Sequence, residues 1–268
     1  MIANKEETWH YTTPKLEAPV ASIGIGIDGA SVLMIEQGWR QAMVGTLALY
    51  DRQGERLHTT YVAATPEYGK ATFLERMDRE IQQVKEHYPQ AVTVGIADGA
   101  ADFWDFLEPR TDRQILDFYH AVEYLTDVAD AVFARQAQQR QEWMSDAAHR
   151  LKHEYTGPSR LIHEMEEFLQ QPLSKDKHGQ VQKALTYFTN HDSLMNYAAH
   201  LDRDLPLGSG VTEAACKVII KQRLCSSGMK WKNKGMATVL TLRSLSYSTG
   251  RWDQFWQKVD QYGFSLAA

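Results

Sequence analysis

Three extended segments precede the first helical pattern in this sequence, and helices alternate with strands after it. In "SIGIGIDGASVLM", Ile23, Ile25 and Ile27 alternate with small residues, which is typical of a strand. Two further strands are predicted in "WRQAMVGTLALYD" and "RLHTTYVAA", joined by a tight turn at residues 51–54. Apolar residues at helical spacing then predict a helix within 68–89, which ends at a proline. This order favours a sheet that begins as a meander.

The second half of the predicted core alternates strand and helix. A fourth strand is expected in "AVTVGIADGA", a short helix near "DFWDFLE" and a fifth strand in "RQILDFYH". Strand signals then stop, and long amphipathic stretches predict helices. We therefore expect an α/β fold with a mixed five-stranded sheet flanked by helices and a large all-helical insertion. The expected parts are a linker or N-terminal arm (1–21), the first part of the core (22–120), the helical insertion (121–207) and the return to the core with a basic C-terminal segment (208–268).

The charge of the chain is unevenly distributed. The formal net charge is −5, yet the stretch from Ala214 to Trp252 contains no acidic residue. A positive strip on an otherwise acidic chain predicts a polyanionic partner. The basic residues of this stretch are Lys217, Lys221, Arg223, Lys230, Lys232, Lys234, Arg243 and Arg251.

Other classes of protein are disfavoured by composition. The sequence has no apolar run of the length that a membrane span needs, about 18 residues, so no membrane partner is expected. The N-terminal residues lack the apolar region of a signal peptide. Cys216 and Cys225 lie nine residues apart in one predicted helical region, which favours reduced thiols in a cytoplasmic protein over a disulfide or a zinc site.

Two aspartates are predicted to end strands in the same sequence context. Asp28 lies in "GIDGA" and Asp98 in "IADGA". Charges at buried strand ends are costly, and two carboxylates brought together raise each other's pKa unless a divalent cation lies between them. With Glu213 at the start of a predicted helix, they form a set of hard oxygen donors that suits Mg²⁺ or Mn²⁺. The alternative at each aspartate is an ordinary Asp-Gly turn.

These motifs together resemble the catalytic core of prokaryotic insertion-sequence transposases of the DDE type, in the mutator-like branch, which have a ribonuclease H-like fold. The resemblance runs from about Ser22 to Trp256 and rests on "IDGASV", "ADGAADFW", "ILDFYHAVEYL", "TEAACKVIIKQRLCSSGMKW" and "GRWDQFW". It implies that Asp28, Asp98 and Glu213 are the catalytic residues and hold two Mg²⁺ or Mn²⁺ ions.

The same resemblance implies the reaction and the partners. The reaction would be cleavage of DNA phosphodiesters and strand transfer, acting on transposon ends and target DNA. A homodimer or higher oligomer on DNA is implied, without a nucleotide cofactor. The location would be the bacterial cytoplasm, with association with the nucleoid when DNA is bound.

Further residues are candidates for positioning DNA. "DFYH" matches the Cys/Asp-x-x-His motif of the branch, which implies roles for Asp117 and His120; a helix N-cap and a buried imidazole are the alternatives. Trp104 is a candidate for stacking on an extruded base or for core packing. The basic residues expected to hold the DNA backbone are Lys217, Lys221, Arg223, Lys230 and Lys232.

Two other functions stay open, and two weaker motifs are set aside. About twenty residues precede the core where full-length transposases carry DNA-binding segments, so a truncated or domesticated transposase that only binds DNA is one alternative. An actin-like ATPase-related domain is the other, although the chain lacks a second glycine-rich loop. His149 and His153 have the spacing of a metal pair without a third ligand, which favours a surface helix face. The pattern at Gly24, Gly26 and Gly29 lies within a strand and does not open a helix.

Overall fold

The computed structural model describes residues 9–262 and divides the chain into two compact units. The first, called here the sheet unit, comprises the chain up to Thr93 and from Gly210 onward; the second, the helical unit, comprises Val94–Ser209. The strands and helices of the sheet unit are β1 (Ser22–Met34), β2 (Gly38–Tyr50), β3 (Arg56–Ala64), η1 (Tyr68–Lys70), α2 (Ala71–His87), the start of β4 (Val92–Ala97), α9 (Gly210–Ala215), η4 (Cys216–Lys221), α10 (Gln222–Leu224), α11 (Asn233–Tyr247) and α12 (Arg251–Tyr262).

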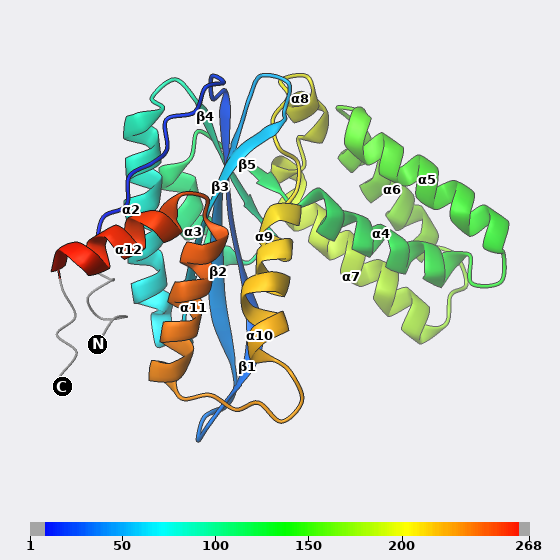
Figure 1. The fold of residues 1–268 in the computed structure, drawn as a ribbon. Coiled ribbons are helices and arrows are strands. Elements are labelled where there is room, and N and C mark those ends of the chain that lie inside the picture. The colour runs from blue at the N-terminus through cyan, green and yellow to red at the C-terminus, as the bar shows by residue number, and fades with distance from the viewer. Residues whose placement is uncertain (1–8, 263–268) are drawn as a thin grey trace. The chain divides into compact units, whose positions relative to one another are not determined.

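The strands form one mixed sheet in the order β3-β2-β1-β4-β5, where β5 is Arg113–Leu116 (Figure 1). β1 pairs with β2 and β2 with β3 in antiparallel fashion, whereas β4 and β5 are parallel. The expected α/β class and the five-stranded mixed sheet are confirmed, and β1 and β4 are neighbours in it. The third strand has the predicted bounds, and the observed fifth strand is shorter than predicted because α4 begins at Phe118.

Side chains on the two faces of the β1–β2 hairpin pack against different helices. Alternate residues of β1, including Ala30, Val32 and Met34, are buried with apolar residues of η4 and α11. The opposite face faces α2: an added Cβ at Gly45 in β2 would lie 2.2 Å from the sulfur of Met77. The apolar residues that recur at helical spacing in the sequence form the buried face of α2, as predicted.

The described part of the expected N-terminal arm is packed onto the sheet unit (Figure 1). Tyr11 is buried in a small apolar cluster with Leu245 and Phe255. Thr12 and Gln254 exchange two hydrogen bonds: the Thr12 amide donates to Gln254 Oε1 at 2.8 Å, and Gln254 Nε2 donates to the Thr12 carbonyl at 3.3 Å. The arm therefore contributes apolar contacts and hydrogen bonds to α12.

The helical unit contains the predicted insertion, and its residues 121–207 as described hold helices and no strand. Contacts between α4 and α5, α5 and α6, α6 and α7, and α4 and α7 form a bundle. None of the helices in the described range combines the length and apolar character needed to cross a bilayer. The helices of this unit are α3 (Ala101–Leu107), η2 (Glu108–Arg110), α4 (Phe118–Val132), α5 (Ala137–His153), α6 (Gly157–Leu169), α7 (Lys175–His191), η3 (Asp192–Leu194) and α8 (Tyr197–Leu201).

Candidate functional site

Asp28 lies in the middle of a strand, which corrects the prediction that it ends one. β1 continues to Met34, and Asp28 pairs with Val44 of β2. The Asp-Gly pair does not turn the chain here, because burial of the alternate residues Ala30 and Val32 keeps the strand extended. Asp98, by contrast, directly follows the last residue of β4, as predicted. The Asp-Gly alternative of a simple turn is therefore wrong for the first aspartate.

A glycine in β1 lets α9 approach the sheet closely. A Cβ added at Gly26 would lie 2.0 Å from Thr212 Oγ1, a distance that atoms do not adopt. Thr212 is buried, and its hydroxyl forms a hydrogen bond of 2.7 Å with the hydroxyl of Thr46 in β2. Because Gly26 and Asp28 are two residues apart in a strand, they lie on the same face. The helix that carries Glu213 is thus held against the face that carries Asp28.

Cys216 interacts with Asp28 and lies within the electrostatic influence of Glu213. Its thiol donates a hydrogen bond to the Asp28 carboxylate. Burial, followed by the charge of Asp28, raises the pKa of the thiol well above its ordinary value, and Glu213 adds to the effect while Lys221 opposes it. A second hydrogen bond, from the Gly29 amide to Asp28 Oδ1 at 2.6 Å, orients the same carboxylate. Asp28, Glu213 and Cys216 therefore form one electrostatic cluster, called here the Asp28 cluster.

The helix after Glu213 is not the continuous α-helix that the sequence suggests. α9 ends at Ala215 and continues as the π-helical segment η4, in which Cys216, Ile219 and Ile220 are buried. Arg243 of α11 donates from Nε to the Ile219 carbonyl at 3.1 Å. Single π-helical turns occur frequently at functional sites. Cys216, the buried first residue of this segment, is the residue that interacts with Asp28.

Asp98 belongs to the helical unit, where α7 holds its backbone. The Tyr187 hydroxyl donates to the Asp98 carbonyl at 2.9 Å, and His191 Nε2 lies 3.2 Å from the Gly99 carbonyl. Gly99 has φ 105°, in the region that favours glycine. The Ala100 amide donates to Asp98 Oδ1 at 3.2 Å. Sequence reasoning did not single out Tyr187 or His191, because helical periodicity does not reveal which loop a helix contacts.

Asp117 is observed as a helix N-cap, which was one of its two predicted roles. It is 2% exposed, and its carboxylate accepts hydrogen bonds from the Tyr119 amide at 3.0 Å and from the Ser209 hydroxyl. His120 is not the buried imidazole of the alternative interpretation. Its side chain is 34% exposed, and Nδ1 lies 3.2 Å from the Glu123 carboxylate. The histidine is therefore accessible, and its role in positioning DNA stays a prediction.

Trp104 is half-buried in α3, and its indole Nε1 is buried without a hydrogen-bond partner among the described groups. Base stacking requires an exposed ring face, so the burial observed here favours packing. His149 and His153, which have the spacing of a metal pair, are both exposed on α5, with ring centroids 4.6 Å apart. The expectation of a surface helix face is confirmed.

The basic strip is smaller than the sequence suggests. Arg251 is 5% exposed and forms an ion pair with Glu80. Arg243 is half-buried, and its guanidinium donates to backbone carbonyls of η4. The sequence predicted that both cations were available to a polyanion. That prediction is wrong, because Arg251 pairs with Glu80 and Arg243 binds backbone carbonyls within the sheet unit. The exposed cations are Lys217, Lys221, Arg223, Lys230, Lys232 and Lys234.

The donor set can be compared with the predicted metal site. Among residues 9–262, no group of three or more His, Cys, Asp or Glu side chains is arranged to hold a metal ion. The Asp28 cluster supplies two carboxylates, whose hard oxygens fit Mg²⁺ or Mn²⁺, and a thiol that is kept protonated. Both cysteines are free thiols, as expected. Comparison of the chain with models of known protein families, and with curated proteins, finds no match.

Proposed function

We propose that this chain is the catalytic domain of a DDE-type transposase with a ribonuclease H-like fold, which cleaves DNA phosphodiesters and transfers the freed strand. The observation that carries the proposal is the packing of α9 against the sheet. Asp28 and Glu213 are far apart in the sequence, yet the close approach of Thr212 to Gly26 and its hydrogen bond to Thr46 hold the helix of Glu213 against the face that carries Asp28. Such convergence of acids from a strand and a returning helix matches the motifs by which the sequence resembles this family.

Asp98 is the third acid of the proposal. It lies six residues after the first residue of β4, and Asp28 lies six residues after the first residue of β1. β1 and β4 are neighbours in the sheet order. The resemblance of "ADGAADFW" to the motif of the family's second acid assigns Asp98 to the set of ligands that includes Asp28 and Glu213.

The protein groups would hold and orient the charged ligands. The Gly29 amide and the Cys216 thiol donate to Asp28 and fix its carboxylate, while the neutral thiol adds no negative charge beside the two acids. Bound Mg²⁺ or Mn²⁺ would activate water and stabilise the charge that develops on the phosphate. We assign Asp28, Asp98 and Glu213 as its ligands.

The proposed reaction has two steps at phosphorus. A water oxygen attacks the phosphate, the bond from phosphorus to the 3′ oxygen breaks, and the leaving oxygen takes up a proton to become a 3′-hydroxyl. In the second step this hydroxyl attacks a phosphate of target DNA and displaces another 3′ oxygen. No covalent bond to the protein forms in either step. The exposed cations after Glu213 would hold the DNA backbone without reading base sequence.

Cation-dependent nicking tests the function directly. We expect the purified chain to convert supercoiled plasmid to the nicked form with Mg²⁺ or Mn²⁺ and not with EDTA. DNA binding without nicking under all cation conditions would contradict the proposal and favour the truncated or domesticated alternative. ATP turnover without nicking would favour the actin-like alternative.

The exposed basic strip predicts a steep dependence of DNA affinity on salt. Each phosphate neutralised contributes about −0.9 to the slope of log affinity against log salt, so four engaged cations give about −3.6. Lys230→Ala and Lys232→Ala should each reduce the slope by about 0.9, because both side chains are exposed. Titration of a labelled duplex at several salt concentrations measures this slope, with Arg52→Ala in the β2–β3 turn as the control. A slope near zero, or tight binding to one sequence only, would contradict the role of the strip.

A further inference from the structure

One face of α7 and Tyr124 of α4 line an open groove in the helical unit, with a volume of about 680 Å³. The groove is lined by basic, amide and hydroxyl side chains, and no acidic residue lines it. Its polar residues recur at helical spacing along α7, so they form one continuous stripe. These residues are Lys175, His178, Gln182, Lys183, Thr186 and Asn190.

The groove ends at the loop that carries Asp98. Tyr187 and His191 both line it, and these are the side chains that contact the carbonyl oxygens of Asp98 and Gly99. A ligand lying along α7 would therefore reach the proposed metal ligand without leaving the helical unit. The position of the groove thus relates it to the proposed reaction.

The wall of the groove combines aromatic rings with a cation. The rings of Tyr124 and Tyr187 stack with centroids 4.0 Å apart and an interplanar angle of 12°. Lys183 Nζ lies 5.2 Å from the centroid of the Tyr124 ring. Aromatic faces beside cations are the usual components of surfaces that bind nucleic acid strands.

We propose that this groove binds the sugar-phosphate backbone of the DNA strand that leads to Asp98, an inference that rests on the proposed function. Lys175 and Lys183 are eight residues apart, about 12 Å along the helix axis. That length corresponds to between three and four nucleotide steps of about 3.4 Å along one strand. The two cations can therefore contact separate phosphates of a single strand.

Charge removal on α7 tests the groove. We expect Lys175→Ala and Lys183→Ala each to weaken DNA binding by about threefold to tenfold and to reduce the salt slope by about 0.9 for duplex or 0.7 for single strands. Lys177→Ala is the matched control, since Lys177 is on the same helix and does not line the groove. Binding is measured by fluorescence anisotropy with a labelled oligonucleotide in EDTA, so the result does not depend on cleavage.

Charge insertion provides a second test that does not depend on removing a lysine. A Cβ added at Gly179, which lines the groove, meets no atom within 4 Å. We expect Gly179→Glu to bind DNA about tenfold more weakly than Gly179→Gln, because the two side chains differ in charge and hardly in size. Circular dichroism of both variants checks that α7 is retained.

Two results would overturn the inference: equal affinities of Gly179→Glu and Gly179→Gln, or lysine variants of the groove that bind like Lys177→Ala. Nicking by the wild type is scored separately. A wild type that binds DNA through the groove and does not nick it would contradict the proposed function while supporting the groove.

Discussion

Replacing Glu213 with glutamine is expected to lower the rate of Mg²⁺-dependent DNA nicking by at least about 1000-fold. The substitution keeps the shape of the side chain and removes the charge that would hold the ion. Metal-assisted stabilisation of a phosphoryl transition state is worth several kcal/mol, and about 1.4 kcal/mol corresponds to a tenfold change in rate. Glu213 is exposed in the first turn of α9, so the fold should not depend on its charge.

Asp28→Asn and Asp98→Asn should have the same effect on nicking without lowering the stability of the metal-free protein. Removing the Asp28 carboxylate relieves its repulsion with Glu213, and Asp98 is exposed, so the melting temperature of either variant without metal should stay the same or rise. Added Mg²⁺ should stabilise the wild type by mass action and stabilise the three variants less. Thermal unfolding with and without Mg²⁺ measures this difference independently of cleavage.

Asp105→Asn is the control for these substitutions, because Asp105 is an exposed acid of α3 with no place in the proposed set. It should nick DNA at the wild-type rate. Wild-type nicking by one of the three variants would remove that residue from the site. A variant that fails to nick and also unfolds at a much lower temperature would be a structural variant, and would not count in favour of the assignment.

Much of the fold was predictable because its local signals agree with its packing. The third strand has the predicted bounds, and the apolar residues at helical spacing in α2 are its buried residues. The segment "SIGIGIDGASVLM" has the bounds of β1, but Asp28 was expected to end the strand because the Asp28-Gly29 pair is typical of a turn. Ala30, Val32 and Met34 continue the alternation past it, and burial of these side chains overrides the local preference.

The acids of the site were predictable, whereas their partners were not. Asp28, Asp98 and Glu213 stand out by sequence context. Cys216 does not, because a single cysteine in a helical pattern does not indicate which strand it contacts. Tyr187 and His191 lie far from Asp98 in the sequence, and their contacts arise from the packing of the helical unit. Tertiary contacts of this kind leave no periodic signal in the chain.

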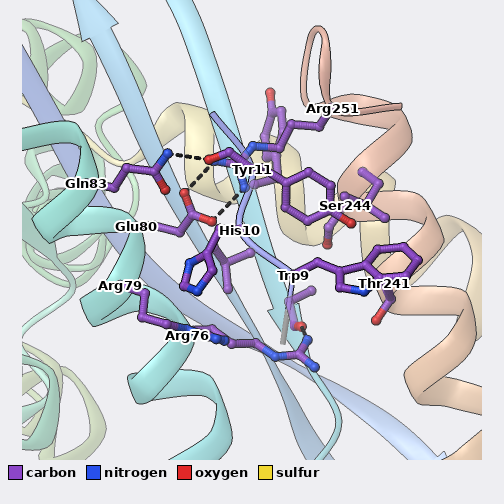
Figure 2. A pocket seen from close by; sticks show the side chains of 14 residues that line it. Trp9, His10, Tyr11, Arg76, Arg79, Glu80, Gln83, Thr241, Ser244 and Arg251 are labelled. Carbon is purple, nitrogen blue, oxygen red and sulfur yellow. Dashed lines mark hydrogen bonds and ion pairs between the residues drawn. The ribbon is translucent and has the colours of Figure 1, made fainter. Parts of the chain in front are cut away.

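Arg251 illustrates how a count of charges misleads. It lies in "GRWDQFW", a motif on which the resemblance to transposases rests, and in the sequence it resembles the exposed lysines before it. In the structure it is the first residue of α12 and lies at a small cavity of about 60 Å³ lined by α2, α11 and the N-terminal arm (Figure 2). Its motif therefore supports the architecture of the sheet unit, and its charge is unavailable to DNA.

The ion pair of Arg251 with Glu80 joins α12 to α2. Both terminal guanidinium nitrogens donate to the carboxylate, Nη1 to Oε1 at 2.6 Å and Nη2 to Oε2 at 2.5 Å (Figure 2). The side chains are only 6% and 18% exposed. The Arg251 guanidinium also lies 5.3 Å from the centroid of the Tyr11 ring, which brings the arm into the same interaction. Removing one partner would leave the other as a buried charge.

Arg251→Ala is therefore expected to lower the free energy of unfolding by about 3–5 kcal/mol, the typical effect of breaking a buried ion pair. The double variant Arg251→Met, Glu80→Leu should lose less than Arg251→Ala, because it leaves no unpaired charge. Arg160→Ala, which breaks the exposed pair of Arg160 with Glu154, should cost at most about 1 kcal/mol. Equilibrium denaturation by urea measures all three. A loss of less than about 1 kcal/mol for Arg251→Ala would mean that water compensates Glu80, and would assign "GRWDQFW" to a role other than holding α12 against α2.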